Sequence, residues 1–350
     1  MPVRRLHTRR EPEYSLDQAQ AQYLPVEDTL QVSPAPAIEE NVSSLSPEAL
    51  KEALNVYRQI DINVDPSQQL LQLLATQKLA SHTKVAYQTK NAFLDDSQTL
   101  DEVKDRFGSI KVKLKNNRYI DLAFQEEDVQ SRLNIRTPKR PELKYIQTML
   151  VAPLLFKEQE DLQNILVIGH GGGSIAKYYS DFYPSKRKTV VDIRPLLFDI
   201  SKEYFDYTPD ANTSFVSSDA SVFLSKARSS GEKYDIINID IFFDGPSDVQ
   251  LNHYFWDNVS SALSSNGVSV TNVWKGEHIE KYDKILAHHM SVFNTVFEIT
   301  NSDTFQVALF GSNIPYEMLM HPNLPIKAVE MFGLTSVDFR THIGNIRRVK

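Results

Sequence analysis

The sequence contains no cysteine among its 350 residues. Disulfides, thiolate metal ligands and a cysteine nucleophile are therefore excluded. A run of about 18 apolar residues, long enough to cross a membrane, is also absent, and the charged start MPVRRLHTRREPEY has no apolar core of the signal-peptide kind. We therefore expect a cytoplasmic protein that is neither secreted nor embedded in a membrane.

Long blocks of lysine or arginine are missing as well, and the formal net charge is −7. Because proteins that bind nucleic acids normally carry a basic face, we expect no nucleic-acid partner. The histidines offer no pattern of metal ligands either. His288 and His289 are adjacent on a predicted helix and so face different ways, and His82, His253 and His278 have no ligand-spaced partners. No metal site is predicted.

The N-terminal third divides into two parts. Residues 1–44 are rich in Gln, Pro, Ala, Ser and Glu and lack periodicity, which predicts a flexible arm. Residues 45–106 predict a helical extension, with helix starts at Ser46-Pro47 and Asp65-Pro66. The leucines of its second helix are too many for one narrow face. We expect that helix to pack against a neighbouring domain or another subunit, so a homodimer is one expectation.

A change of period at residue 107 marks a small β module over residues 107–142. Apolar residues alternate on both sides of Asn116-Asn117, which has the composition of a tight turn. They are Ile110, Val112, Leu114, Ile120, Leu122 and Phe124. This pattern predicts a β-hairpin with one covered face.

Residues 143–312 alternate strand and helix patterns after an apolar helix at 143–156. The strand candidates are 165–168, 189–191, 213–216, 234–240, 267–274, 297–300 and 305–310. The helix candidates between them include 196–205, 220–226, 252–263 and 281–293. The last two strands must pair antiparallel, because a parallel crossover needs about a dozen residues. The fold class is therefore α/β, a Rossmann-like methyltransferase fold whose mostly parallel seven-stranded sheet ends in an antiparallel pair. Residues 313–350 form a C-terminal extension.

Glycines follow the first strand of this domain, at positions 169, 171, 172 and 173. Glycines at a strand-to-helix turn let the backbone approach a ligand, and the next helix presents unpaired N–H groups. The following strand ends at Asp192, about 20 residues further on, where such units place a carboxylate for ribose hydroxyls. The pattern predicts a nucleoside-type ligand.

From Phe107 to Ser312 the sequence resembles the spermidine synthase family and its looser bacterial relatives on the methyltransferase fold. The resemblance rests on segments that stand in the family's order. They are Phe107-Gly108-Ser109-Ile110, Val129-Gln130-Ser131, Ile168-Gly169-His170-Gly171-Gly172-Gly173, Asp192, Asp219-Ala220 and Tyr234-Asp235-Ile236-Ile237-Asn238-Ile239-Asp240.

The resemblance implies roles for individual residues. Those implied to bind the cofactor are Gln130, Gly169, His170, Gly171, Gly173, Asp192, Asp219 and Ala220. Gln130 would contact its nucleoside side, Asp192 its ribose hydroxyls and Asp219 its adenine amino group. Asp240 would be the general base and Asp244 a second acid. Alternatives remain for four of them: Asp192 could be a solvated acid at a strand end, Asp219 suits a helix cap, His170 could fill space, and Asp244-Gly245-Pro246 is also typical of a turn.

Two departures from the family concern its amine substrates. Gly172 stands where the family has an acid, and Ile146-Gln147-Thr148 replaces a tyrosine, histidine and glutamate, with Tyr145 one place away. Both are expected to remove polar contacts. Our preferred interpretation is an aminopropyltransferase-like enzyme that uses decarboxylated S-adenosylmethionine, no metal, and an amine acceptor such as putrescine. The alternatives are an S-adenosylmethionine-dependent methyltransferase and a non-catalytic family member acting as an interaction module.

Overall fold

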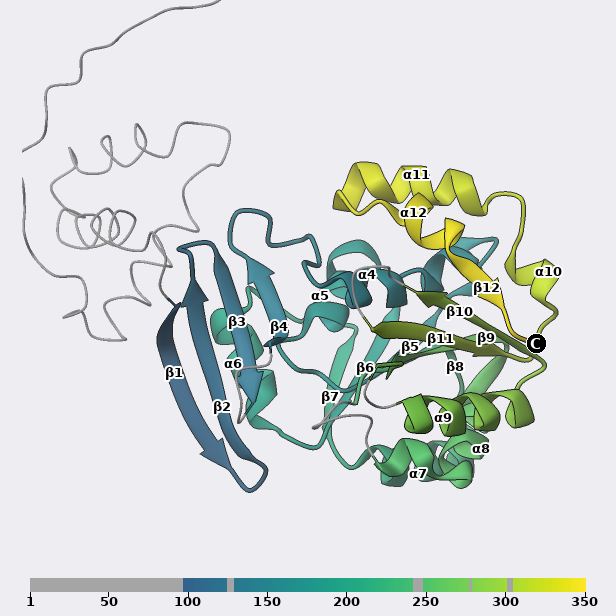
Figure 1. Ribbon diagram of the computed structural model, residues 1–350, viewed down its shortest axis with the longest axis horizontal. Helices are drawn as coiled ribbons and strands as arrows, with labels where there is room; N and C mark the ends of the chain where they lie inside the picture. Colours follow the sequence, from purple (N-terminus) through teal and green to yellow (C-terminus); the bar gives the residue numbers. More distant parts are fainter. Residues whose placement is uncertain (1–96, 125–128, 242–247, 277–278, 301–304) are drawn as a thin grey trace, which may run out of the picture. The chain divides into compact units, whose positions relative to one another are not determined.

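The computed structural model describes residues 97–124, 129–241, 248–276, 279–300 and 305–350. The predicted arm, the two N-terminal helices and Asp244 lie outside these ranges. Within them, the strands form one antiparallel sheet of four strands and one mixed sheet of eight (Figure 1). The proposed domain boundaries at residues 107, 143 and 313 stay predictions.

The four-stranded sheet contains the predicted hairpin and extends it on both sides. Its strands pair in chain order: β1 (Ser97–Asp105), β2 (Gly108–Lys115), β3 (Tyr119–Phe124) and β4 (Val129–Asn134). Asn116 and Asn117 form the tight turn between β2 and β3 with φ of 52° and 50°, the left-handed conformation that asparagine tolerates better than most residues.

Strand β1 lies within the range assigned above to the helical extension. Its apolar residues Leu100 and Val103 are three positions apart, a spacing that suits a helix. In the structure a bulge between Thr99 and Asp101 interrupts the pairing with β2. The extra residue changes the alternation, so that Leu100 is buried and Val103 is half-buried in the same apolar cluster. Pairing with β2 therefore overrides the local pattern.

The eight-stranded sheet confirms the predicted methyltransferase-like plan. Its order is β12-β10-β11-β9-β8-β5-β6-β7. Strands β5 to β9 pair in parallel, and β11 pairs antiparallel with β9 on one side and with β10 on the other. The bounds are β5 (Asn164–Ile168), β6 (Arg187–Asp192), β7 (Thr213–Ser217), β8 (Tyr234–Ile239), β9 (Leu263–Trp274), β10 (Thr295–Thr300), β11 (Gln306–Ser312) and β12 (Ile346–Arg348).

Strand β12 is an addition to the seven strands predicted. It has three residues and pairs antiparallel with β10. The buried carboxylate of Glu298 on β10 accepts hydrogen bonds from Arg347 and from Lys275. A three-residue strand is too short to show a period in the sequence, and only its pairing with β10 identifies it.

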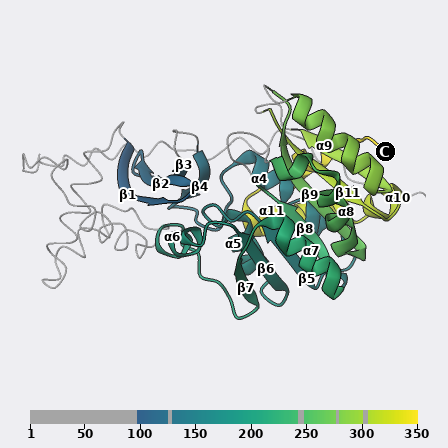
Figure 2. The same ribbon diagram turned by 90° about the horizontal axis from the view of Figure 1, so that it is seen from below.

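Helices cover both faces of the mixed sheet (Figures 1 and 2). Alternate residues of β5 belong to two separate apolar cores: Ile165 and Val167 pack on one face, and Leu166 and Ile168 on the other. The first core includes α4 (Lys144–Met149), α5 (Ser174–Phe182), α11 (Leu324–Thr335) and α12 (Phe339–Gly344). The second includes α7 (Ala220–Ser230), α8 (His253–Ala262) and α9 (Ile279–Val292).

Shorter segments complete the described chain. They are the 3₁₀ helices η3 (Ala152–Leu155), η4 (Gln159–Asp161) and η5 (Asp248–Leu251), and helix α10 (Tyr316–Leu319). The apolar helix predicted over 143–156 is split into α4 and η3, with Pro153 near the start of η3. Proline lacks the N–H that a continuing helix would need.

Helix α6 (Leu196–Tyr204) joins the two sheets. Its buried Leu197, Ile200 and Tyr204 lie in one apolar cluster with residues of β1, β2, β3 and β4. The hydroxyl of Tyr204 also donates to Asp101 on β1 at 3.0 Å. The small sheet is therefore held against the element that directly follows β6.

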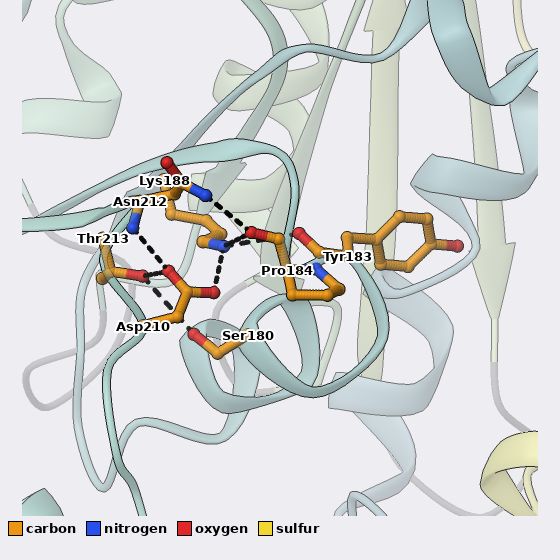
Figure 3. A network of polar contacts seen from close by, with 7 residues as sticks. All are labelled: Ser180, Tyr183, Pro184, Lys188, Asp210, Asn212 and Thr213. Atoms are coloured by element: carbon orange, nitrogen blue, oxygen red, sulfur yellow. Dashed lines mark hydrogen bonds and ion pairs between the residues drawn. The ribbon is translucent and has the colours of Figure 1, made fainter.

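An ion pair lies near the start of strand β6, at the end away from the cavity-facing Asp192 (Figure 3). The side chain of Lys188 is fully buried and its Nζ donates to Asp210 Oδ2 at 2.5 Å. The same Nζ contacts the carbonyl oxygens of Tyr183 and Pro184, which follow α5. Asp210 Oδ1 accepts from the Thr213 hydroxyl at the start of β7. One lysine thus connects α5, β6 and β7.

Replacing Lys188 with methionine should lower the free energy of unfolding by about 3 kcal/mol, because it leaves Asp210 without its cation. Asp210 keeps 23% exposure of its side chain, which limits the loss. Urea unfolding measures it. Arg340→Met, which breaks the exposed pair with Asp338, is the control and should cost about 1 kcal/mol or less. Equal losses in the two variants would contradict the structural role of Lys188.

Candidate active site

A cavity of about 280 Å³ lies at the carboxyl edge of the parallel strands, at the small end of the range for ligand pockets. The ends of β5, β6 and β8 coincide there, because Ile168 pairs with Val191 on one side and with Ile239 on the other. Three carboxylates line it, from Asp192, Asp219 and Asp240. The edge of an open α/β sheet is where such folds bind ligands.

The glycine turn forms the floor of this cavity. Gly169 has φ of 90°, and a Cβ built on it would lie 2.0 Å from the main-chain oxygen of Asp240. Gly171, with φ of 53°, also lines the cavity, and its Cβ would meet Ser131 Oγ at 2.8 Å. Gly173, with φ of 83°, instead packs against the rings of His170 and Tyr207. The turn therefore excludes side chains at Gly169 for a steric reason.

Asp192 ends β6 with its carboxylate held by main-chain donors. Oδ2 accepts from the N–H of His170 at 2.7 Å, and Oδ1 accepts from the N–H of Arg194 at 2.8 Å. Burial raises the pKa of Asp192, while these two hydrogen bonds and the Arg194 charge oppose the rise. A carboxylate can accept about four hydrogen bonds, so Asp192 can still accept one from a ligand hydroxyl.

Asp240 directly follows β8 and faces the same cavity. Its Oδ1 accepts from Asn272 Nδ2 at 2.9 Å and its Oδ2 from the hydroxyl of Tyr145 at 3.3 Å. Burial raises its pKa to about 6, with the two hydrogen bonds opposing the rise and the charge of Asp192 adding to it. A carboxylate with this pKa is ionised at neutral pH and suited to accept a proton.

Tyr145, one place away from the position of the family's tyrosine, lines the cavity. It is the second residue of α4, and its hydroxyl lies 3.2 Å from the carbonyl oxygen of Gln130 as well as near Asp240. Gln147 and Thr148 do not line the cavity, because their side chains donate to the carbonyls of Pro141 and Lys144. Sequence reasoning missed both Tyr145 and Asn272 as site residues.

The ring of His170 packs away from solvent. Its Nε2 lies 2.8 Å from Ser201 Oγ, and its ring contacts those of Phe198 and Phe215. Burial, and less strongly the charge of Lys202, lower its pKa to about 3, so the ring is neutral. His170 lines the cavity, and its main-chain N–H donates to Asp192.

Asp219 performs the alternative role foreseen for it and lies at the cavity as well. It is the N-cap of α7, and its Oδ1 accepts from the N–H groups of Ser221 and Val222 at 2.8 and 3.1 Å. Ala220 and Gln130 also line the cavity. The structure therefore brings together every implied cofactor residue except Gly173.

Gly172 turns its α-carbon away from the cavity. Its N–H donates to Ser131 Oγ at 2.9 Å, and an added Cβ would lie 2.8 Å from Ser131 Cβ and from Phe205 Cδ1. A carboxylate at this position would require both side chains to move. The family's acid is thus not restored by substitution alone.

Two further properties concern the described ranges only. No cluster of three or more His, Asp or Glu side chains in them has the arrangement of a metal site. Within the same ranges, every helix is too short or too polar to cross a membrane.

Comparison with known proteins agrees with this geometry. Residues 142–326 match the family model described as "Spermine/spermidine synthase domain". A polyamine aminopropyltransferase of Neisseria meningitidis is 31% identical over 230 residues, which cover 65% of this chain and 84% of that protein. The chain belongs to the spermine/spermidine synthase family, a family of transferases.

Two further similarities differ in what they cover. A polyamine aminopropyltransferase of Vibrio vulnificus is 32% identical over 161 residues, and the match spans 45% of this chain but only about half, 52%, of that protein. The crystal structure of the spermidine synthase of Thermotoga maritima superposes with a TM-score of 0.54, over 71% of this chain and 83% of that one. At 13% identity this second similarity establishes the fold alone.

Proposed function

We propose that this protein transfers the aminopropyl group of decarboxylated S-adenosylmethionine to an amine such as putrescine. The observation that carries the proposal is the half-buried carboxylate of Asp240, which faces the cavity with a pKa raised to about 6. The names of the Neisseria and Vibrio relatives support the same reaction. A cytoplasmic location and a homodimer belong to this proposal.

Asp240 would act as the base. An amine acceptor enters as an ammonium ion, binds the carboxylate and loses one proton to it. The freed nitrogen lone pair would form a bond to the aminopropyl carbon that is bonded to the sulfonium sulfur. The carbon–sulfur bond breaks with its electron pair going to sulfur, which leaves as the neutral thioether methylthioadenosine. Tyr145 and Asn272 would keep the carboxylate oriented through the hydrogen bonds described above.

The nucleoside would lie along the glycine turn. Asp192 would accept hydrogen bonds from the ribose hydroxyls, and Asp219 from the adenine amino group. Helix α5 begins at Ser174, directly after the turn, and its first N–H groups lack partners within the helix. The cavity thus offers acceptors for the sugar and base and an acid for the amine.

Asp192→Ala should weaken binding of methylthioadenosine by about 1.5–3 kcal/mol, the range for hydrogen bonds to a charged group, which is about 10- to 150-fold in Kd. Isothermal titration calorimetry measures it. The control is Asp199→Ala on α6, whose side chain is 80% exposed and outside the cavity lining. If both variants bind like the unmutated protein, Asp192 is not a ribose ligand.

One observation favours a second candidate, an S-adenosylmethionine-dependent methyltransferase. Gly172 provides no acid for the ammonium of the decarboxylated cofactor. Incubating the protein with either cofactor and a panel of polyamines, and weighing the products by mass spectrometry, distinguishes aminopropyl from methyl transfer. If neither cofactor gives a product while the protein still binds methylthioadenosine, a non-catalytic family member would be favoured.

A further inference from the structure

Arg194 joins two parts of the cavity wall that come from different sheets. Its main-chain N–H donates to Asp192 Oδ1 at 2.8 Å. Its guanidinium donates to both carboxylate oxygens of Asp105 at 2.9 Å, from Nε and Nη2, and from Nη2 to the carbonyl oxygen of Gly108 at 2.9 Å. Only 4% of the residue is exposed. One residue therefore contacts both the end of β6 and the β1–β2 turn.

The β1–β2 turn carries part of the wall. Asp105 ends β1 and Gly108 begins β2, and Asp105 Oδ1 also accepts from the N–H of Phe107 at 2.8 Å. Phe107 lines the cavity, as does Phe124 on β3. The guanidinium carbon of Arg194 lies 4.7 Å from the centre of the Phe124 ring and 5.9 Å from that of Phe107. Arg194 thus contacts both rings that line this part of the cavity.

We propose that Arg194 is a positioning residue that couples occupancy of the adenosyl site at Asp192 to the placement of the β1–β2 turn. The identity of the ligand in this proposal rests on the proposed function. A ligand that fixes the Asp192 carboxylate also fixes its donor, the Arg194 main chain, and through the side chain it fixes Asp105, Gly108 and Phe107. Because coupling between two sites is reciprocal, a change that loosens the β1–β2 turn lowers the affinity for the ligand.

The chemistry of the pair suits this role. A guanidinium presents its donors in a planar fork that matches a carboxylate in one orientation, whereas a lysine ammonium does not constrain direction. Burial acts to raise the pKa of Asp105, but the hydrogen bonds from Arg194 and from the Phe107 N–H leave it lowered. The carboxylate is therefore ionised in the folded protein, and the pair persists at neutral pH.

Arg194→Lys and Asp105→Asn test the coupling in the full chain. Both keep the fold's apolar contacts and remove the bidentate geometry. We expect each to raise the Kd for methylthioadenosine by about 5- to 150-fold, the usual range of coupling between sites. In the unmutated protein the ligand should also slow hydrogen exchange at residues 105–108. That protection should be lost in both variants.

Lys188→Met is the matched control. It removes another buried ion pair, on the same strand β6 but away from the cavity lining. It should lower the unfolding midpoint without changing the Kd or the protection of the β1–β2 turn. If Lys188→Met and Arg194→Lys weaken binding by the same factor, the effect is one of stability and the coupling is refuted.

The remaining outcomes separate this inference from the proposed function. Unchanged affinity in Arg194→Lys and Asp105→Asn, with clear binding by the unmutated protein, would overturn the coupling alone. An unmutated protein that binds neither methylthioadenosine nor S-adenosylhomocysteine would overturn the proposed function, and the coupling with it. Should Arg194→Lys fail to fold, Asp105→Asn still decides, because it preserves the shape of the side chain.

Discussion

Asp240→Asn is expected to lower turnover with the amine acceptor by about 10²–10⁴-fold, the usual size of general-base catalysis. Asparagine keeps the shape of the side chain and can still accept the hydrogen bond from Asn272. It cannot take the proton that the attacking ammonium must lose. The affinity for methylthioadenosine should stay nearly constant, because in the proposed site Asp192 and Asp219 would bind the ribose and adenine.

The pH profile of the unmutated protein gives a second measurement on the same residue. Burial raises the pKa of Asp240 to about 6, so the carboxylate is protonated below that pH and cannot act as a base. The value of kcat/KM should therefore rise as the pH passes through about 6 and level off above it. Asp240→Asn should lack this limb.

The same raised pKa predicts a gain in stability from the substitution. The folded state binds the proton of Asp240 more tightly than the unfolded chain, in which an aspartate has its ordinary pKa of 3.8. Stability from this group is complete below the unfolded pKa and is lost as the pH rises through about 6. At pH above 7, Asp240→Asn should therefore raise the free energy of unfolding by an amount on the order of 1–3 kcal/mol, and with it the unfolding temperature. The difference should shrink toward pH 4.

Asp235→Asn is the control from the same strand. Asp235 lies at the other end of β8 and accepts hydrogen bonds from the N–H groups of Gln163 and Asn164 and from Ser264. It should lower stability without the large loss of turnover. If Asp240→Asn lowers ligand affinity and turnover by the same factor, Asp240 is a ligand contact and not the base.

The sequence predicted the main sheet well because each strand carries its own signal. The buried parallel strand β5 contains the continuous apolar run Ile165 to Ile168, the strand β8 is mostly apolar, and the glycine turn follows β5 at once. The segment β1 was not recognised as a strand, because its bulge gives Leu100 and Val103 a helical spacing. Three-residue β12 depends on Glu298 and Arg347, which are 49 positions apart in the chain.

The sequence predicted those site residues that lie at the end of a strand. Asp192 and Asp240 are recognisable from β6 and β8 alone. The partners that hold them were not, since Tyr145 reaches Asp240 across 95 positions of sequence and Arg194 reaches Asp105 across 89. Only the packing of α4 and of the small sheet brings these groups to the cavity.

Gly169→Ala should lower both stability and turnover, because this position has no room for a methyl group. The added Cβ would lie 2.0 Å from the main-chain oxygen of Asp240 and 2.8 Å from its carbonyl carbon. Strain from φ of 90° costs about 1 kcal/mol for an L-residue. Separating the ends of β5 and β8 to relieve the overlap adds about 1–3 kcal/mol. We expect a total loss of about 2–4 kcal/mol in the free energy of unfolding.

Gly169→Ala should lower turnover because the main chain of Asp240 must move to make room for the new methyl group. The Asp240 N–H donates to the Ile168 carbonyl at 2.8 Å, so the two strand ends are tied together. Displacing the Asp240 main chain displaces its carboxylate, and a shift near 1 Å can lower a rate by about 10²-fold. Gly231→Ala provides the comparison: it has φ of 75° at the end of α7, with no atom within 4 Å of the added Cβ. It should cost about 1 kcal/mol from strain alone and leave turnover unchanged. Equal effects of the two substitutions on unfolding and on kcat would show that contact with Asp240 is not what requires glycine at position 169.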